Sequence, residues 1–321
     1  MTTLLRVFQE AAEHGTAAQE HGVAETVLHG AEAAEQAAGG GVPDIGGMLM
    51  HHLADAQELE LPWGVVPLPH WEPLHIAGLT IDLSPTKHVV FMLLAAVLVT
   101  LFGILAARAI AGKYKGKAPS GFSNALEAMI LYFRDEIVRR NIGHGADAFT
   151  PFILTLFFFI LVMNLLGLVP WGASATGNIM VTFALAFLVT LPVIELSGFS
   201  ALGPRGYAKT IFYAPKGMGP VGTAIMLCIM TPVEVVGKIA KPFALTVRLF
   251  ANMTAGHTVI LSLVGLIFVF GQATGVRWVV AGGSVGMSLA MMLLEIFVAF
   301  LQAYIFAMLA SVFIGLIRHA H

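Results

Sequence analysis

The sequence has 321 residues, of which 57% are hydrophobic and 11% are charged, and its formal net charge is −2. Soluble domains have about 25% charged residues, so the composition excludes an ordinary soluble domain and predicts an integral membrane protein. No cluster of Lys and Arg with interleaved aromatic residues indicates nucleic-acid binding. Because Cys228 is the only cysteine, an intramolecular disulfide and a cysteine metal cluster are also excluded.

The first 86 residues form a polar extension with frequent Gly and Pro, as in Gly39–Pro43. They lack the continuous apolar core of a secretory signal, and their pattern is typical of loop or short local helix. Histidines such as His51 and His52 have no i, i+4 partner with an acidic companion, so we expect no metal site here. We therefore divide the chain into a polar extension, residues 1–86, and a membrane domain, residues 87–321.

The first predicted membrane span is Val89–Ala107, which has about the 20 apolar residues that a bilayer crossing requires. A basic cluster follows this span: Arg108, Lys113, Lys115 and Lys117. Basic residues near span ends favour the cytoplasmic side. This predicts a cytoplasmic loop after the span and places the N-terminal extension on the outer, periplasmic side.

The next segment, Phe122–Ile142, is amphipathic rather than uniformly apolar. Its apolar residues recur at i, i+3 and i+4: Leu126, Met129, Ile130, Phe133 and Ile137. Its charged residues fall elsewhere around the helix: Glu127, Arg134, Asp135 and Arg139. Such a pattern predicts a helix that lies on the membrane surface.

Two further spans are predicted at Phe149–Val169 and Ile179–Leu196. The first ends at Pro170. The second leads to a loop whose basic residues favour the cytoplasmic side: Arg205, Lys209 and Lys216.

The last two helical patterns, Thr223–Gly271 and Trp278–Arg318, are much longer than a bilayer requires. At 1.5 Å per residue they measure about 70 Å and 60 Å, against a hydrocarbon thickness of about 30 Å. They form either a steeply inclined hairpin or helices broken at Pro232, Pro242 and Gly265, and we favour the hairpin. The predicted fold is an all-α membrane protein with about five crossing helices, one amphipathic surface helix and a cytoplasmic C-terminus.

Arg248 lies within the first long apolar helix, where a charge costs roughly 2.5–3.5 kcal/mol and usually marks a substrate or ion route. Glu234, Lys241 and Arg248 follow one another at seven-residue steps, which keeps them on nearly the same face, and Asn252 follows one turn later. Long side chains at the cytoplasmic interface offer another explanation for Glu234, Lys238 and Lys241. That explanation does not extend to Arg248 and Asn252.

Small residues share the face of Arg248: Ala244, Ala251 and Ala255. Small side chains let another helix approach closely, which favours a partner packed against the arginine. Contacts with helices of the same chain would explain the alanines equally well, but they would not explain the charge.

The second long helix has its own polar line, because Ser288, Glu295 and Gln302 recur at seven-residue steps. A buried glutamate with ordered polar neighbours has the parts of a proton wire. His257 on the first long helix suits proton exchange, since an imidazole titrates near neutral pH. A neutral, hydrogen-bonded His257 is the alternative.

These residues resemble subunit a of F-type ATP synthases. The resemblance rests on Glu234, Lys241-Pro242, Arg248-Leu-Phe-Ala-Asn252-Met, Ala255-Gly256-His257 and the segment from Glu295 through Leu301-Gln302-Ala303-Tyr304. It extends to the order of first span, surface helix and Met163-Asn164-Leu165-Leu166, and leaves only the extension before about residue 86 uncovered.

The resemblance implies that Arg248 is the essential arginine facing the carboxylates of a rotating ring of small subunits, between two offset aqueous half-channels. It implies an outer half-channel with these residues: Asn252, His257, Glu295, Gln302 and Asn164. Glu234 would belong to the cytoplasmic exit. Two departures stand out, because many bacterial members have Glu at position 257 and His at position 295, and because Gly167 stands where some members carry Asp.

The implied partners are the c-ring, the b subunits of the peripheral stalk, other ATP synthase subunits, membrane lipid and protons. No Gly-rich loop followed by Lys and Ser/Thr is present, so the chain itself is not catalytic, any ATP chemistry resides in a partner, and no cofactor is expected. Absence of a transit-peptide pattern favours the bacterial plasma membrane over the mitochondrial inner membrane, and H⁺ is favoured over Na⁺.

The alternative function is a stand-alone secondary cation/proton transporter with Glu295 and His257 as its ion site. Such transporters usually contain internal repeats. The segments around Arg248 and Gln302 are not repeated elsewhere in the chain, which argues against it. A purely structural membrane anchor would leave the charges within the apolar helices unexplained.

Overall fold

The computed structural model of the chain describes residues 47, 55–61, 64–71, 74–76, 79–81, 84–108, 121–169, 172–212, 219–270 and 275–319. His51, His52 and Gly39–Pro43 lie outside the described residues. The chain divides into two compact units, one made of Leu53–Leu261 with Met287–His321 and the other of Met1–His52 with Ser262–Gly286. The larger unit contains every residue predicted to have a functional role.

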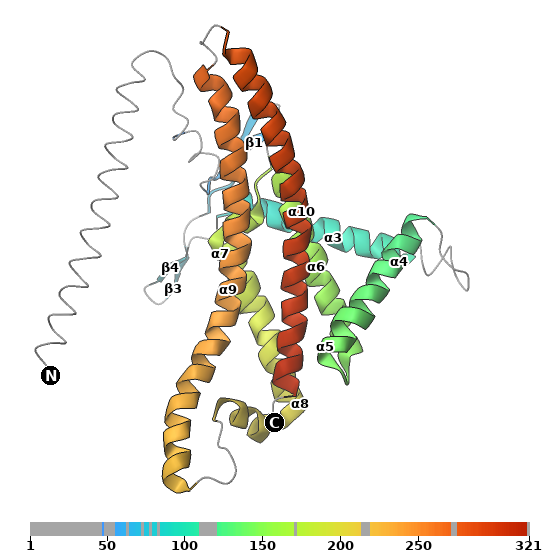
Figure 1. Ribbon diagram of the computed structural model, residues 1–321, viewed down its shortest axis with the longest axis vertical. Helices are drawn as coiled ribbons and strands as arrows, with labels where there is room; N and C mark the ends of the chain where they lie inside the picture. Colours follow the sequence, from blue (N-terminus) through green and yellow to red (C-terminus); the bar gives the residue numbers. More distant parts are fainter. Residues whose placement is uncertain are drawn as a thin grey trace, which may run out of the picture. The chain divides into compact units, whose positions relative to one another are not determined.

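Helices dominate the described residues (Figure 1). They are α3 (Lys87–Arg108), α4 (Phe122–Tyr132), α5 (Arg140–Ile142), α6 (Thr150–Leu168), α7 (Ile179–Phe183), α8 (Leu191–Ile211), α9 (Pro220–Val269) and α10 (Arg277–Arg318). Wider π-helical segments, Phe133–Arg139 and Ala184–Thr190, join α4 to α5 and α7 to α8. Short 3-10 turns at Ala146–Ala148 and Ala175–Gly177 precede α6 and α7.

Five helical stretches in the described part of the chain are long and apolar enough to cross a membrane. They correspond to the five predicted spans, and the helical run from α4 to α5 matches the predicted amphipathic segment, Phe122–Ile142. The predicted all-α membrane fold is therefore confirmed. The third span differs from its prediction, since helix continues past Leu196 to Ile211.

A bend lies inside α8 at Gly203, whose φ of 69° places it in the left-handed region. Glycine adopts this conformation at little cost, and Pro204 is well suited to begin the helical turns that follow. The Gly-Pro pair thus ends one helical segment and starts another, so α8 extends beyond the predicted span without remaining straight.

Two short antiparallel hairpins lie before α3, β1 (Glu58–Leu61) with β2 (Gly64–Pro67) and β3 (Leu74–Ile76) with β4 (Leu79–Ile81). Loop or short helix is the prediction for this region, so the strands are a correction to it. Each strand has three or four residues, which is too short for an alternating apolar pattern to stand out in a sequence.

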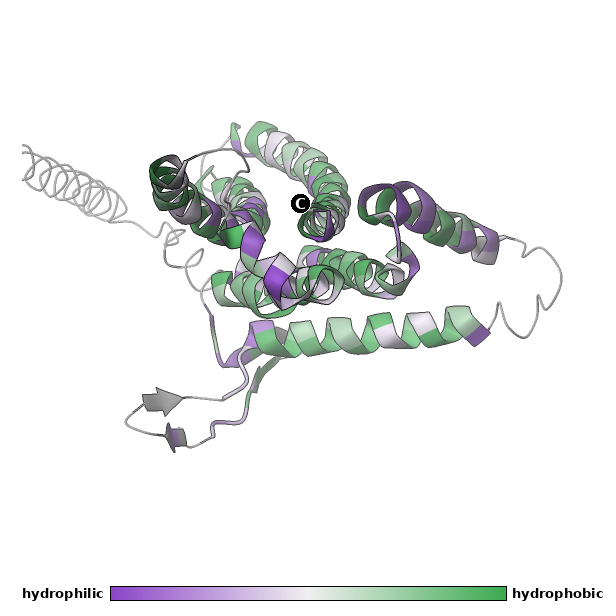
Figure 2. Cartoon of the chain, turned by 90° about the horizontal axis from the view of Figure 1, so that it is seen from below, coloured by the Kyte–Doolittle hydropathy of each residue, from purple (hydrophilic) through white to green (hydrophobic). Residues whose placement is uncertain are grey.

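Hydropathy distinguishes α3 from the amphipathic segment (Figure 2). The helix α3 is green or pale over most of its length and purple near its ends, whereas α4 and the segment after it mix both colours. Most α3 side chains are exposed or half-buried, including Leu93, Val97 and Leu101. This all-round apolar surface fits a helix that stands in lipid.

The orientation of α3 bears on the two long helices. In Figures 1 and 2 the axis of α3 runs across the direction of α10 within the larger unit. Two helices that cross steeply cannot both stand along the bilayer normal. With 50 and 42 residues, α9 and α10 measure about 75 Å and 63 Å, so the inclined hairpin accommodates them where upright helices would not.

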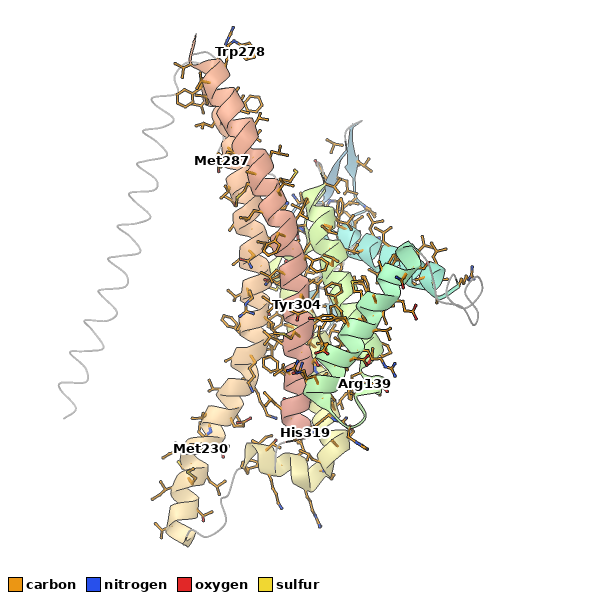
Figure 3. The ribbon with its side chains drawn as sticks, turned by 45° about the vertical axis from the view of Figure 1, so that its right-hand side comes forward. Arg139, Met230, Trp278, Met287, Tyr304 and His319 are labelled. Atoms are coloured by element: carbon orange, nitrogen blue, oxygen red, sulfur yellow. The ribbon has the colours of Figure 1, made fainter. Side chains whose placement is uncertain are left out.

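The core lies where α10 packs against α6 and the amphipathic segment. Phe133 and Phe157 have ring centroids 4.5 Å apart, and Phe300 contacts Phe157 edge-on. Figure 3 shows Tyr304 on the side of α10 that faces this segment, and its hydroxyl lies 3.3 Å from that of Tyr132. The apolar face predicted to rest on the membrane is thus largely covered by protein.

Candidate functional site

Arg248 lies on an exposed face of α9. Ala244, Ala251 and Ala255 on the same helix are also exposed, and so is Phe243, with 58% of its surface accessible. Within the described part of the chain, the guanidinium makes no hydrogen bond or ion pair. A charge on an apolar, small-residue surface of a membrane helix requires a counter-charge or water from outside the chain.

One helical turn after Arg248, the two long helices are joined by polar side chains. The amide of Asn252 donates to Oε1 of Gln302 at 3.1 Å. Nδ1 of His257 lies 2.8 Å from Oε1 of Glu295. Glu295 and Gln302 are almost fully buried, with 3% and 4% of their surface exposed. Four residues predicted to share a role are therefore in two direct contacts.

The hydrogen bonds of His257 define where its protons lie. Nε2 lies 2.8 Å from the backbone oxygen of Gly167, and a carbonyl oxygen only accepts, so Nε2 carries a hydrogen. The contact between Nδ1 and Glu295 then holds one proton, either as carboxylic acid with neutral imidazole or as carboxylate with imidazolium. This pair can pass a proton from one partner to the other without moving its heavy atoms.

Asn164 is fully buried on α6 and belongs to the same neighbourhood. Its amide nitrogen donates to the backbone oxygen of Ala299 at 3.3 Å, and its amide oxygen accepts from Thr176 at 2.7 Å. Ala299 follows Glu295 by about one turn of α10. The structure thus brings Asn164 close to the pair formed by His257 and Glu295.

Ser288 occupies the same face of α10 two turns before Glu295, as predicted, but the structure gives it no hydrogen bond. Its hydroxyl oxygen is buried and without a protein partner, and so is Oε2 of Glu295. Buried polar atoms of this kind are uncommon and call for a polar neighbour such as ordered water. The face of α10 that carries Ser288 and Glu295 therefore has buried polar atoms that the protein itself does not pair.

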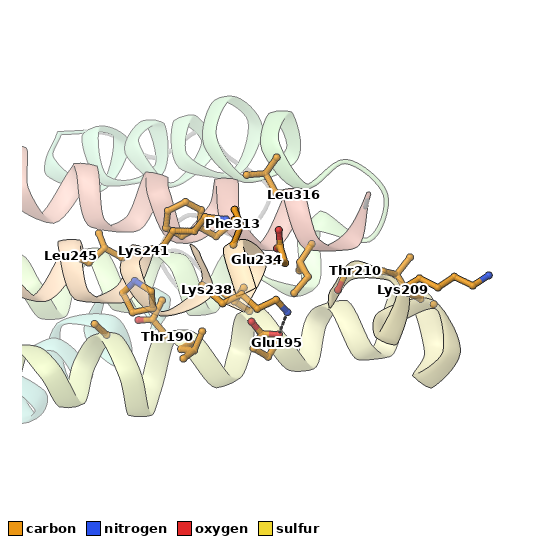
Figure 4. A pocket seen from close by; sticks show the side chains of 18 of the residues that line it. Thr190, Glu195, Lys209, Thr210, Glu234, Lys238, Lys241, Leu245, Phe313 and Leu316 are labelled. Carbon is orange, nitrogen blue, oxygen red and sulfur yellow. Dashed lines mark hydrogen bonds and ion pairs between the residues drawn. The ribbon is translucent and has the colours of Figure 1, made fainter. Parts of the chain in front are cut away.

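Glu234 belongs to a separate region, a cavity of about 520 Å³ between α8, α9 and the end of α10 (Figure 4). Polar and charged side chains on its wall are Thr190, Glu195, Lys209, Thr210, Glu234, Lys238 and Lys241. Leu245, about one turn before Arg248, also lines it. The cavity therefore ends near Arg248 on its N-terminal side along α9, whereas Asn252 lies on its C-terminal side.

Inside this cavity, Lys238 is already paired. Its ammonium lies 2.9 Å from Oε2 of Glu195 and 3.2 Å from the hydroxyl of Tyr207, which also donates to Glu195. Figure 4 shows the ion pair as a dashed line. In the described part of the chain Glu234 has no ion pair. Of the two carboxylates in the cavity, only Glu234 is without a fixed cation.

Glu195 lines this cavity and Tyr207 bonds to it, and neither is among the residues predicted to have a role. Glu195 is the one acidic residue in the predicted span Ile179–Leu196. The argument that identifies Arg248, a charge within an apolar segment, applies to it as well. Tyr207 gives no comparable signal, because its role depends on the bend of α8 at Gly203.

Comparison with known proteins gives one consistent family. Residues 89–315 match the family described as ATP synthase A chain. The chain is 43% identical over 296 residues to ATP synthase subunit a 2 of Chlorobaculum tepidum, covering 92% of this chain and 79% of the relative. It is 46% identical over 268 residues to ATP synthase subunit a of Chloroherpeton thalassium, covering 83% and 75%. It is 42% identical over 322 residues to ATP synthase subunit a of Anaeromyxobacter dehalogenans, covering 96% and 79%.

Proposed function

The chain belongs to the ATP synthase subunit a family, and from that premise we propose that it is the proton-translocating stator subunit of a rotary F-type ATP synthase. As a member of this family it is a proton-channel subunit of the membrane sector, and other ATP synthase subunits are its partners. The finer proposal concerns Arg248, which separates two offset half-channels and deprotonates the passing carboxylates of a c-ring.

The observation that carries this proposal is the order of polar groups along α9. Glu234, Lys238 and Lys241 line the cavity, Arg248 follows with an unpaired guanidinium, and Asn252 then begins the contacts with α10. Along α9, the positive charge of Arg248 thus lies between two polar regions: the cavity before it and the contacts with α10 after it. A fixed charge in this position opposes direct proton passage between the two regions.

The electrostatics of the arginine supply the mechanism. A ring carboxylate that reaches Arg248 is stabilised in its ionised form, so it releases its proton there. Away from the arginine, a carboxylate that faces lipid must be protonated, because a charge in hydrocarbon is costly. Rotation is then biased by where protons are gained and lost, and each charge that crosses the membrane field supplies about 2.3 kcal/mol per 100 mV.

The contacts between α9 and α10 fit the outer half-channel. The pair of His257 and Glu295 holds one transferable proton. Asn252, whose amide bonds to Gln302 of α10, lies between His257 and Arg248 along α9. Asn164 and Ser288 are further polar groups of this route. The cavity with Glu234 fits the inner half-channel, in which Glu234 takes protons released near Arg248.

The chain is a multi-pass protein of a bacterial membrane, as its bacterial relatives and five apolar helices support. We propose that the N-terminal extension lies in the periplasm and that the C-terminus lies in the cytoplasm. The exposed face around Arg248 would receive the c-ring, because its small side chains permit close helix approach. The b subunits of the peripheral stalk would contact the chain elsewhere.

Replacement of Arg248 by lysine tests the function. Lysine keeps the charge when protonated, but a desolvated ammonium can lose its proton, whereas a guanidinium does not. We expect Arg248→Lys to reduce ATP-driven proton pumping in inverted membrane vesicles by about tenfold or more, with the complex still assembled. Arg248→Ala should abolish coupled pumping.

Arg277→Lys is the matched control, since Arg277 is exposed and stacks on Trp278, with its guanidinium carbon 5.3 Å from the ring centroid. We expect the control to pump at the wild-type rate. Wild-type pumping by Arg248→Lys in assembled complexes would refute the proposed role of the arginine.

A further inference from the structure

Lys238 has two acidic residues near it, and the structure pairs it with the one that is more distant in sequence. Glu234 precedes Lys238 by four residues on α9. A glutamate four residues before a lysine is the favoured order for an ion pair along a helix, so local geometry alone would join these two. Instead the ammonium lies 2.9 Å from a carboxylate oxygen of Glu195 on α8. Packing of α8 against α9 thus replaces the local pair with a pair between helices.

Further contacts hold Lys238 on the α8 side of the cavity. Its ammonium lies 3.2 Å from the hydroxyl of Tyr207, which itself donates to Glu195. The same ammonium lies 4.6 Å from the centroid of the Tyr207 ring, within the range of a cation–π contact. Only 17% of the lysine side chain and 25% of the glutamate side chain are exposed, so solvent and salt screen this pair less than a surface pair. Figure 4 shows Lys238 reaching from α9 to Glu195, whereas the Glu234 carboxylate points away from that pair.

The other cations on the cavity wall leave Glu234 unpaired as well. Lys241 follows Glu234 by two helical turns, and its ammonium lies 5.4 Å from the ring centroid of Phe313 on α10. Lys209 on α8 points away from the cavity in Figure 4. The α10 residues that line the cavity carry no charge: Phe313, Leu316 and Ile317. Lys238 is therefore the cation whose position decides whether Glu234 is paired.

The placement of Lys238 matters because a paired Glu234 would exchange protons poorly. An ammonium beside a carboxylate favours the ionised form, so the carboxylate would bind protons less readily. We propose that Glu195, with Tyr207, is a positioning residue of the inner half-channel: by holding Lys238 against α8, it leaves the Glu234 carboxylate free to exchange protons. This inference deepens the proposed function and depends on it.

The test is ATP-driven proton pumping by the whole complex in inverted membrane vesicles, whose outer medium contacts the cytoplasmic side. Glu195→Gln keeps the shape of the side chain but has no charge to hold Lys238, which is then free to turn to Glu234. We expect its rate, relative to the wild type, to fall by about tenfold at about pH 8. The rate should recover as the outer medium is acidified, because a higher proton concentration compensates for weaker proton binding. An unchanged rate, or an equal loss at every pH, would overturn the inference.

Removal of the lysine separates positioning from structural support. In the double variant Glu195→Gln/Lys238→Gln no cation is released, so the pumping rate and its pH dependence should return to those of the wild type. If Glu195 only supported the packing of α8 on α9, the second substitution would remove a further contact and the rate would stay low. A double variant that assembles and does not recover would therefore contradict the proposed positioning role.

Glu136→Gln is the matched control, because it also takes a glutamate from an ion pair. Glu136 lies 3.2 Å from Arg140, and both side chains are largely exposed. This control should pump like the wild type at every pH. If Glu195→Gln does not assemble, Tyr207→Phe decides the question, since it removes one of the two hydrogen-bond partners of Lys238. Its pH dependence should shift in the same direction by a smaller amount, and an unchanged pH dependence would overturn the inference.

Arg248→Lys and Glu234→Gln measured in the same vesicles separate the two proposals. If both are impaired while Glu195→Gln matches the wild type across the pH range, only the positioning role is refuted. If Arg248→Lys pumps normally, the proposed function itself fails, whatever the result at Glu195. Adding Glu195→Gln to Glu234→Gln should cause no further loss, because the carboxylate that Lys238 would block is already absent.

Discussion

The position of the Glu295 carboxylate depends on a glycine of the neighbouring helix as well as on its partner His257. Glu295 rests against Gly256, where an added Cβ would lie 2.6 Å from Oε1. The absence of a side chain at this position is what lets the carboxylate reach His257. Gly256 therefore determines the geometry of the pair of His257 and Glu295, although it has no titratable group.

We expect Gly256→Ala to displace the carboxylate of Glu295 from His257. Proton pumping should fall by about tenfold, while the amount of assembled complex remains unchanged, because the moving group is the flexible end of a side chain. Pumping in inverted vesicles and subunit content together measure this. Gly237→Ala, on the same helix with open space around it, is the control, and a normal pumping rate for Gly256→Ala would contradict the expectation.

The residues of the site could be predicted individually, but their pairing could not. Arg248, Glu295 and Gln302 stand out because polar groups in apolar helices are costly. The contacts of Asn252 with Gln302 and of His257 with Glu295 depend on the relative register of two helices. Periodicity within one helix does not contain that register.

For whole helices too, the sequence predicts some features, whereas others are determined by packing between elements. Apolar runs of about 20 residues predict the spans well, because hydrocarbon leaves a segment few alternatives to helix. The two strand hairpins and the bend at Gly203 escape such reasoning, since they depend on a few residues. Ion pairing between Glu195 and Lys238 likewise arises only when α8 and α9 are placed side by side.

At Gly315, α10 packs directly against the backbone of the amphipathic segment. A Cβ at this position would overlap the backbone oxygen of Asn141, and backbone cannot move aside as a side chain can. We expect Gly315→Ala to destabilise the packing by about 1–3 kcal/mol and to lower the yield of assembled complex. Thermal unfolding of the purified complex measures this.

Gly103→Ala provides the comparison for that experiment, because Gly103 lies within α3 with open space around it. It should leave the unfolding temperature unchanged or raise it, since alanine favours helix over glycine. A Gly315→Ala complex as stable as Gly103→Ala would show that α10 and α5 can separate without loss.

For the chain as a whole, the proposed orientation rests on basic residues around the helix ends. With cysteines introduced in a Cys228→Ser background, a membrane-impermeant maleimide applied to spheroplasts should label Trp71→Cys and spare Ala208→Cys. Both positions are exposed in the structure. Permeabilised membranes should label both. Labelling of Ala208→Cys alone in intact spheroplasts would reverse the topology.

The contacts behind α10 have a mechanical consequence. Ser311 donates to the backbone of Ile137 at 3.1 Å, Tyr304 meets Tyr132, and Arg318 donates to the backbone of His144 at 3.1 Å. These contacts hold one side of α10, over several turns, to the amphipathic segment and to the turn that follows it. In the proposed function, a turning c-ring would exert a lateral force on this chain. Because α10 is supported over several turns, little of the work from each proton would be lost in bending it.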